Sequence, residues 1–173
     1  DYADSILRGT IVKVEDKAST FSKEEAVSEY RYTVVLGVEW FDVKKEEIID
    51  VASFIRDELQ FDHAESVSGV DYPEDKQIEV VYHLGSYTDP SLSKQILALV
   101  TRAPREDVPH PGNDSTKLPS LRDVFPSVSF HERECFEMLG VYFEGHPDNR
   151  RLLLPEDWAD IPPLRKDFAI KGR

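Results

Sequence analysis

The densest group of chemistry-bearing side chains lies in residues 130–139, where the spacing of apolar residues predicts a short helix. Glu132 falls among the apolar positions of that helix, and a carboxylate there needs hydrogen-bond donors to offset its loss of water. One interpretation is a buried structural pair with an arginine such as Arg150 or Arg151. The other is a general acid–base group with a raised pKa. We favour the structural pair, because ion-pair networks also bury carboxylates.

Metal ligation is the second chemistry that this stretch suggests. His131 and Cys135 are four residues apart, so one helix face presents both, and His146 is a third candidate. The zinc-protease pattern His-Glu-x-x-His is absent, because Cys135 occupies the position of its second histidine, and no Cys-x-x-Cys occurs. We therefore expect no metal site. A small stand-alone enzyme that uses Glu132 with His131 or His146 is kept as the alternative function of a different class.

The composition argues against several other classes of protein. The chain carries 34 acidic and 21 basic residues, a net charge of −13, which disfavours binding to nucleic acid or to an anionic membrane surface. Its eight glycines form no nucleotide-binding or phosphate-binding pattern. The single cysteine cannot supply the four ligands of an iron–sulfur cluster, and it favours a reducing, cytosolic compartment. The longest apolar run, from Ile96 to Val100, is too short to span a membrane.

The elements that must position these residues alternate between strand-like and helical periods. In chain order they are an edge strand at 6–15, a strand at 32–40, a helix at 43–60 with Asp42 as its N-cap, an extended stretch at 63–70, a strand at 77–83, a strand or short helix at 95–102, a loop at 104–119 and a short helix at 121–125. This order predicts an α+β fold with a small mixed or antiparallel sheet and packed helices.

Three features define the predicted helix near residue 130. Ser129 and Glu132 have the spacing of a capping box at its start, and Gly140 is a typical residue just past its end. Arg133 and Glu137 are four residues apart, which predicts an ion pair on the exposed face.

The sequence changes character from residue 140 onward. Four prolines exclude regular structure over about thirty residues, yet this stretch is rich in leucine and aromatic residues, unlike a disordered segment. We divide the chain into an α+β domain at 1–139 and an extended, partner-binding tail at 140–173. A small domain has little spare apolar surface, so we expect the tail to bind a partner. The alternative is a tail wrapped on its own sheet.

The C-terminal third resembles a known family over about forty residues. The motifs that carry the resemblance are Glu132-Arg133-Glu134, Met138-Leu139-Gly140-Val141, Phe143-Glu144-Gly145-His146-Pro147-Asp148, Arg150-Arg151-Leu152-Leu153, Pro155-Glu156-Asp157-Trp158 and Pro163-Leu164-Arg165-Lys166-Asp167-Phe168. In this order they closely resemble the signature of the complex I 30-kDa subunit family. Val70-Asp71-Tyr72-Pro73 and the strand at 77–83 extend the resemblance to about residues 43–168, and residues 1–42 lie outside it.

The resemblance implies a non-catalytic assembly subunit of the peripheral arm of a membrane oxidoreductase. Such a subunit has no cofactor of its own and no small-molecule ligand. It sits on the cytoplasmic face of the membrane beside iron–sulfur subunits and a large subunit that holds a quinone site or a nickel–iron centre, and it meets the membrane arm only indirectly. The implied interface residues are Glu132, Arg133, Glu134, Gly140, Gly145, His146, Pro147, Arg150, Arg151, Pro155, Trp158, Leu164, Arg165, Lys166 and Asp167.

The chain also departs from the family pattern. Cys135-Phe136-Glu137 replaces the usual aromatic–acidic pair, and Asp160-Ile161-Pro162-Pro163 replaces a glycine followed by one proline. These variants resemble the subunits of archaeal membrane-bound [NiFe] hydrogenases and related sulfur-reducing complexes. We therefore expect a ferredoxin-dependent membrane-bound hydrogenase coupled to ion translocation. The alternatives within the family are quinone-reducing complex I and a sulfane sulfur reductase.

Overall fold

The computed structural model describes residues 37–107, 116–158 and 161–170, with the side chains of residues 37–40 left aside. Its elements are, in chain order, β1 (Gly37–Asp42), α2 (Ile48–Asp57), β2 (His63–Tyr72), β3 (Gln77–Gly85), the 3₁₀ turn η1 (Pro90–Leu92), β4 (Gln95–Pro104), β5 (Lys117–Pro119), the 3₁₀ turn η2 (Pro126–Val128), α3 (Ser129–Leu139) and β6 (Tyr142–Glu144).

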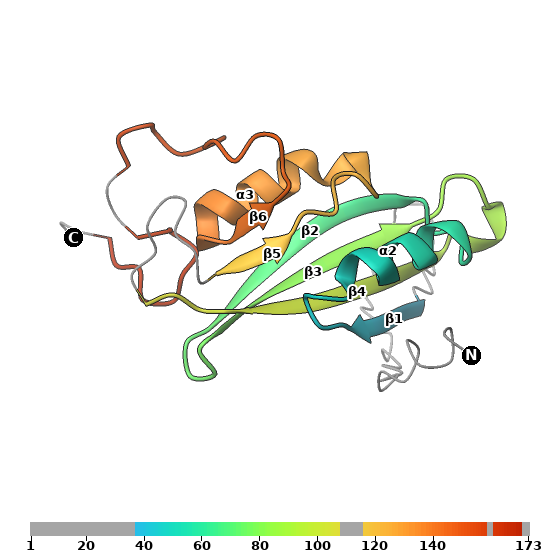
Figure 1. Cartoon of the computed structure of the whole chain (residues 1–173), viewed down its shortest axis with the longest axis horizontal. Coiled ribbons are helices and arrows are strands. Elements are labelled where there is room, and N and C mark those ends of the chain that lie inside the picture. Colours follow the sequence, from blue (N-terminus) through green and yellow to red (C-terminus); the bar gives the residue numbers. More distant parts are fainter. Residues whose placement is uncertain (1–36, 108–115, 159–160, 171–173) are drawn as a thin grey trace, which may run out of the picture.

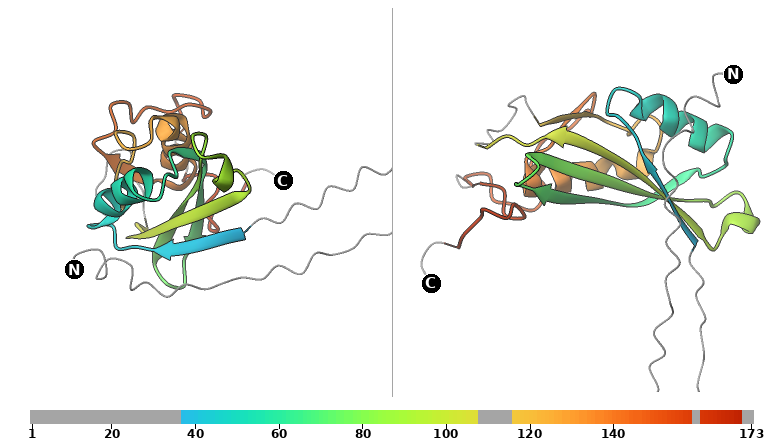
Figure 2. Two further views of the ribbon diagram at one scale, coloured as in Figure 1. Left: turned by 90° about the vertical axis from the view of Figure 1, so that its right-hand side faces the viewer. Right: turned by 90° about the horizontal axis from the view of Figure 1, so that it is seen from below.

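Four strands form one mixed sheet in the order β1-β4-β3-β2. β1 is parallel to β4, whereas the β3–β4 and β2–β3 pairs are antiparallel. β5 and β6 form a separate parallel pair. Both helices and the β5–β6 pair lie over the same face of the large sheet (Figures 1 and 2). The fold is therefore α+β with a small mixed sheet, as the sequence predicts.

The core lies between this sheet face and the helices. In each element, apolar residues recur at the spacing that places them on the face toward the core. α2 contributes four buried residues spaced as one helical face, Ile48, Val51, Ala52 and Ile55. On β3 every second side chain points to the helices. These β3 residues, all fully buried, are Ile78, Val80, Tyr82 and Leu84.

The strands at 77–83 and 95–102 are confirmed as β3 and β4, so residues 95–102 are not helical. The predicted helix at 43–60 is shorter than expected and begins at Ile48. Its expected N-cap is wrong: Asp42 ends β1 and pairs with Arg102, 2.7 Å away, while Glu47 stands at the cap without a side-chain hydrogen bond. The edge strand at 6–15 and the first half of the strand at 32–40 lie outside the described residues.

The capping box at Ser129 is also wrong. The turn η2 runs directly into α3, Val128 takes the cap position, and no side chain caps the helix. The predicted helix at 121–125 is only a turn, closed by the Phe125 N–H on the Leu121 carbonyl. Two three-residue strands were missed, β5 in the predicted loop and β6 in the predicted tail. The end of α3 is confirmed, because Gly140 has a φ of 81°, which suits glycine.

Candidate functional site: the anchored C-terminal segment

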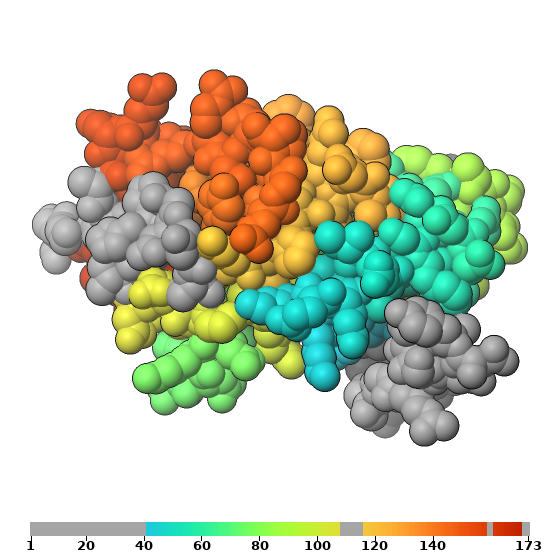
Figure 3. Space-filling model, viewed as in Figure 1, coloured from blue at the N-terminus to red at the C-terminus, as the bar shows by residue number. Residues whose placement is uncertain are grey.

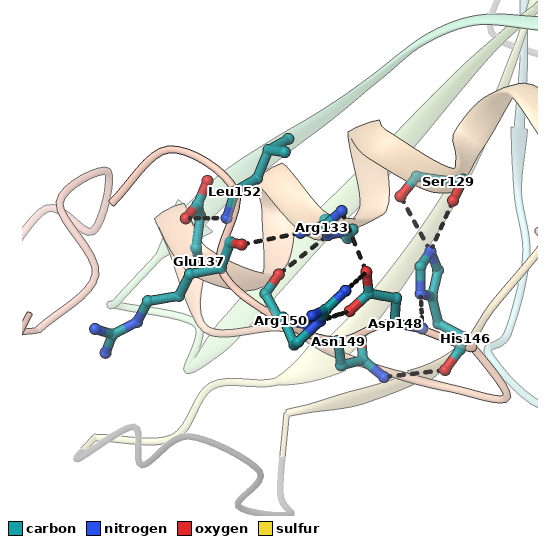
Figure 4. A network of polar contacts seen from close by, with 9 residues as sticks. Ser129, Arg133, Glu137, His146, Asp148, Asn149, Arg150 and Leu152 are labelled. Atoms are coloured by element: carbon teal, nitrogen blue, oxygen red, sulfur yellow. Dashed lines mark hydrogen bonds and ion pairs between the residues drawn. The ribbon is translucent and has the colours of Figure 1, made fainter. Parts of the chain in front are cut away.

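We call the described residues that follow β6 the C-terminal segment. Helix α3 holds the backbone of this segment with two side chains that lie one turn apart (Figure 4). Arg133 donates to the carbonyls of Arg150 and Arg151, at 3.1 and 2.9 Å. Glu137 accepts the three successive N–H groups of residues 152–154, at 2.9, 2.8 and 3.0 Å. The predicted ion pair between Arg133 and Glu137 is therefore wrong: both side chains bind the segment, and Glu137 is buried.

We call these contacts of Arg133 and Glu137 the clamp. On the N-terminal side of the clamp, the chain turns around Asp148 and His146. Asp148 lies 2.6 Å from the Arg150 guanidinium and 3.4 Å from Arg133, and hydrogen bonding by Arg150 lowers the pKa of the carboxyl to about 2. The Asp148 N–H donates to His146 Nδ1 at 3.0 Å, which places the imidazole proton on Nε2, 3.0 Å from the Ser129 carbonyl. His146 is thus a buried anchor between the segment and the first turn of α3 (Figure 4).

Arg151 organises the middle of the segment. Its guanidinium donates to the carbonyls of Pro155, Glu156 and Trp158, at 2.8, 2.9 and 2.7 Å. The Trp158 ring lies 6.0 Å from the Phe168 ring, and this contact links the middle of the segment to its far end. One guanidinium therefore fixes a turn that lacks regular secondary structure.

The far end of the segment is attached through a network of charged groups. Arg165, almost fully buried, donates to the Leu139 carbonyl at 2.7 Å and to the Glu106 carbonyl. Asp71 accepts from Arg105 Nε at 2.6 Å and from the Lys166 N–H at 2.9 Å. Burial alone would raise the pKa of Asp71, but these hydrogen bonds outweigh it and the pKa is lowered. Arg105 also lies 2.9 Å from Asp167.

These contacts attach the described part of the segment to its own domain, and its binding to a partner stays a prediction. They engage mainly backbone groups and charged side chains, and they leave large apolar side chains facing outward. Exposed fractions are 61% for Leu153, 61% for Leu164 and 70% for Ile170. In the space-filling view, orange-to-red atoms of the segment lie at the molecular surface beside the lighter orange atoms of the preceding residues (Figure 3). A fixed backbone with outward apolar side chains is suited to contact another protein.

Glu132 is fully buried, as the sequence predicts, but its partners are neutral rather than arginines. It accepts from Tyr82 Oη at 3.1 Å, from Ser120 Oγ at 2.6 Å and from the Leu121 N–H at 2.8 Å. Burial raises its pKa to about 6, although these three hydrogen bonds oppose the rise. The carboxylate joins α3, β3 and the chain after β5.

The two metal-ligand candidates on α3, His131 and Cys135, lie in different surroundings. His131 lies at the partly exposed start of α3, and burial raises the pKa of the Cys135 thiol to about 12. Within the described residues, no group of three or more histidine, cysteine, aspartate or glutamate side chains is placed to hold a metal ion.

Most of the interface residues expected from the sequence lie in or beside the anchored segment. Glu134 differs, since it is exposed on α3, on the side that faces β2. Gly145 takes a φ of 86° in the turn before His146. The sequence did not single out Glu137, Asp71 or Arg105 as anchors, because their partners lie 15 or more residues away along the chain.

Comparison with known proteins identifies the family of the chain. The family model described as respiratory-chain NADH dehydrogenase, 30 Kd subunit, matches residues 41–173. The chain belongs to this family. Members that it resembles include the C subunit of the F(420)H(2) dehydrogenase of Methanosarcina mazei, 37% identical over 144 residues that cover 83% of each chain. The C subunit of the NADH-quinone oxidoreductase of Roseiflexus sp. is 41% identical over 131 residues, which cover 74% of this chain and 68% of that one.

Among solved structures, this 30 Kd-type chain resembles a chain of the membrane-bound sulfane sulfur reductase, an archaeal respiratory membrane complex. The TM-score is 0.61 at 28% identity, and the match covers 86% of this chain and 78% of the other. No helix in the described part of the chain has the length and apolarity needed to cross a bilayer.

Proposed function

We propose that this chain is a non-catalytic assembly subunit of the peripheral arm of a complex I-related membrane oxidoreductase. The observation that carries the proposal is the anchored segment, whose backbone α3 holds while Leu153 and Leu164 face outward. A surface held rigid before binding loses little conformational entropy when a partner covers it. The iron–sulfur clusters, and the nickel–iron centre or quinone site, then belong to the partner subunits.

Which complex the chain belongs to is a finer question, and the named relatives favour a different answer from the sequence variants. The variants around Cys135 and Pro162 suggested a ferredoxin-dependent membrane-bound hydrogenase. The two relatives at 37% and 41% identity are instead named as subunits of F(420)H(2) dehydrogenase and NADH-quinone oxidoreductase, and the sulfane sulfur reductase chain is at 28%. Sequence similarity therefore supports a dehydrogenase complex, related to F(420)H(2) dehydrogenase or NADH-quinone oxidoreductase, ahead of the hydrogenase. Nickel analysis of the purified complex distinguishes the two.

The experiment that tests the assembly role replaces the outward leucines. The tagged double variant Leu153→Asp/Leu164→Asp, expressed in place of the native copy, is expected to recover much less assembled complex, because each charge would enter an apolar contact. The isolated variant should unfold at the same temperature as the parent chain. Reversal of Arg165 would be a poorer test, because that side chain is buried and its loss would release the segment.

A matched control is Ile49→Asp, which places the same charge at a 45%-exposed aliphatic residue on α2. It should leave the yield of complex unchanged. Full recovery of complex from the double variant, or equal loss from the control, would contradict the proposal.

A further inference from the structure

Strand β2 forms one edge of the large sheet, with β3 as its neighbour on the inner side. In an edge strand, every second residue directs its backbone N–H and carbonyl away from the sheet. Among the described residues, no backbone–backbone hydrogen bond reaches residues 66–70 from outside the sheet. A stretch of this length is enough to pair with an added strand.

The two ends of this edge are protected, whereas its middle is not. At the start, the register shifts between Ala64 and Ser66, and Ser127 Oγ bonds both the N–H and the carbonyl of Ala64, at 3.3 and 3.0 Å. At the other end, Asp71 is bound by the Lys166 N–H of the anchored segment. Residues 66–70 contain no charged residue and no proline, the two side-chain devices that usually stop strand addition.

A pocket opens beside this unprotected stretch, between β2 and α3. Its volume is about 270 Å³, which is room for a large apolar side chain. Its lining is mainly apolar and includes Val67, Met138, Leu139 and Leu164. Gly69 leaves the wall without a side chain, and Leu139 fills that space so closely that a β-carbon on Gly69 would lie 2.0 Å from its Cδ1.

We propose that residues 66–70 of β2, with the pocket beside them, bind an extended segment of a partner subunit. That segment pairs with β2 as a fifth strand, inserts one apolar side chain into the pocket and places a lysine or arginine beside Glu134. Strand addition of this kind draws its affinity from main-chain hydrogen bonds and its specificity from the side-chain pocket. The inference rests on the proposed function, since it assumes that the chain works within an assembly.

Charge decides between a partner and a second copy of this chain. Glu134 lines the pocket, is exposed, and makes no ion pair with any described residue. The chain has a net charge of −13, so two copies paired along β2 would repel each other. A basic flank on the incoming strand instead gives Glu134 an opposite charge. The occupant that fits is therefore an apolar residue with a basic neighbour on an extended segment of another subunit.

Site-specific photo-cross-linking in the assembled complex tests the inference. p-Benzoylphenylalanine replaces Ser68, which is exposed and lines the pocket, in the tagged chain. The complex is purified in mild detergent, irradiated and analysed by mass spectrometry. We expect one reproducible cross-link to a segment of a partner subunit that has an apolar residue next to lysine or arginine. A cross-link to residues 1–36 of the same chain, or to a second copy, overturns the inference.

A second probe at Leu153 separates this inference from the proposed function. If Leu153 captures a partner and Ser68 captures none, strand addition at β2 is wrong and the assembly role stands. If neither probe captures another subunit, both are wrong. With the Ser68 probe in place, Glu134→Lys should reduce the cross-link about tenfold. Glu58→Lys, at an exposed carboxylate directly after α2, should not change it. Equal yields from both variants also overturn the inference.

Discussion

Glu137 makes the contacts on which the position of the C-terminal segment most depends. Its carboxylate accepts three N–H groups, and hydrogen bonds to a charged group contribute roughly 1.5–3 kcal/mol each. Glu137→Ala removes all three, but the freed N–H groups then bind water once the segment opens. We therefore expect a net loss of roughly 3 kcal/mol for holding residues 152–154, or about a hundredfold in the local opening equilibrium.

Glu137→Gln gives a finer test of the same geometry. Oε2 accepts from both Leu152 and Leu154, whereas Oε1 accepts only from Leu153. A glutamine has one carbonyl oxygen, and placing it at the Oε2 position keeps two of the three bonds. Its amide group then faces the Leu153 N–H, donor against donor. We expect the Leu153 amide to lose most of its protection in this variant.

Hydrogen exchange resolved by residue measures both variants. The amides of residues 152–154 should exchange about a hundredfold faster in Glu137→Ala. The amides of β3 (Gln77–Gly85) should change little, because the sheet does not depend on the clamp. Unchanged exchange at residues 152–154 would refute the clamp. Equally faster exchange in β3 would show that Glu137 stabilises the whole domain rather than the segment.

Three further predictions concern Glu132, Gly69 and Cys135. The folded-state pKa of Glu132, about 6 against a usual 4.5, lies above the unfolded value, so the native state loses about 2 kcal/mol of stability as pH rises through this window. We expect the difference in free energy of unfolding between Glu132→Gln and the parent to shift by that amount in favour of the variant from pH 4.5 to pH 7.5. Urea unfolding at the two pH values measures this difference, and an equal difference at both would contradict the prediction. Gly69→Ala should destabilise by roughly 1–3 kcal/mol, since Leu139 must move. The loss should shrink in a Leu139→Ala background, and denaturation curves that show no such coupling would refute the close approach. Cys135, whose pKa burial raises to about 12, should react with a thiol reagent at pH 8 only after unfolding. Rapid labelling of the native chain would contradict this.

The elements that the sequence predicted well are those whose pattern repeats over several residues. The alternation of Ile78, Val80 and Tyr82 and the helical spacing of Ile48 to Ile55 depend only on which face meets the core. Gly140 marked the end of α3 because glycine readily adopts its left-handed conformation. The buried position of Glu132 also followed from helical period alone.

The parts that failed depend on partners distant in sequence. β5 and β6 are three residues long and exist because they pair with each other, which no local pattern reveals. Glu137 looked like half of a surface ion pair, yet the three N–H groups that it binds come from a loop 15 to 17 residues further on. Asp71 and Lys166 meet across 95 residues. Such distant contacts are why attachment of the tail to its own domain was only the alternative at the sequence level. Binding of the tail to a partner stays a prediction.

Affinity purification through a tag on this chain, in mild detergent and followed by mass spectrometry, is the most direct test of the assembly role. We expect a large membrane assembly that contains iron–sulfur subunits and a large subunit in fixed stoichiometry with this chain. Nickel in that assembly would select the hydrogenase, and its absence would leave the dehydrogenase and the sulfane sulfur reductase. Recovery of the chain alone, from cells in which the assembly itself is intact, would contradict the assembly role.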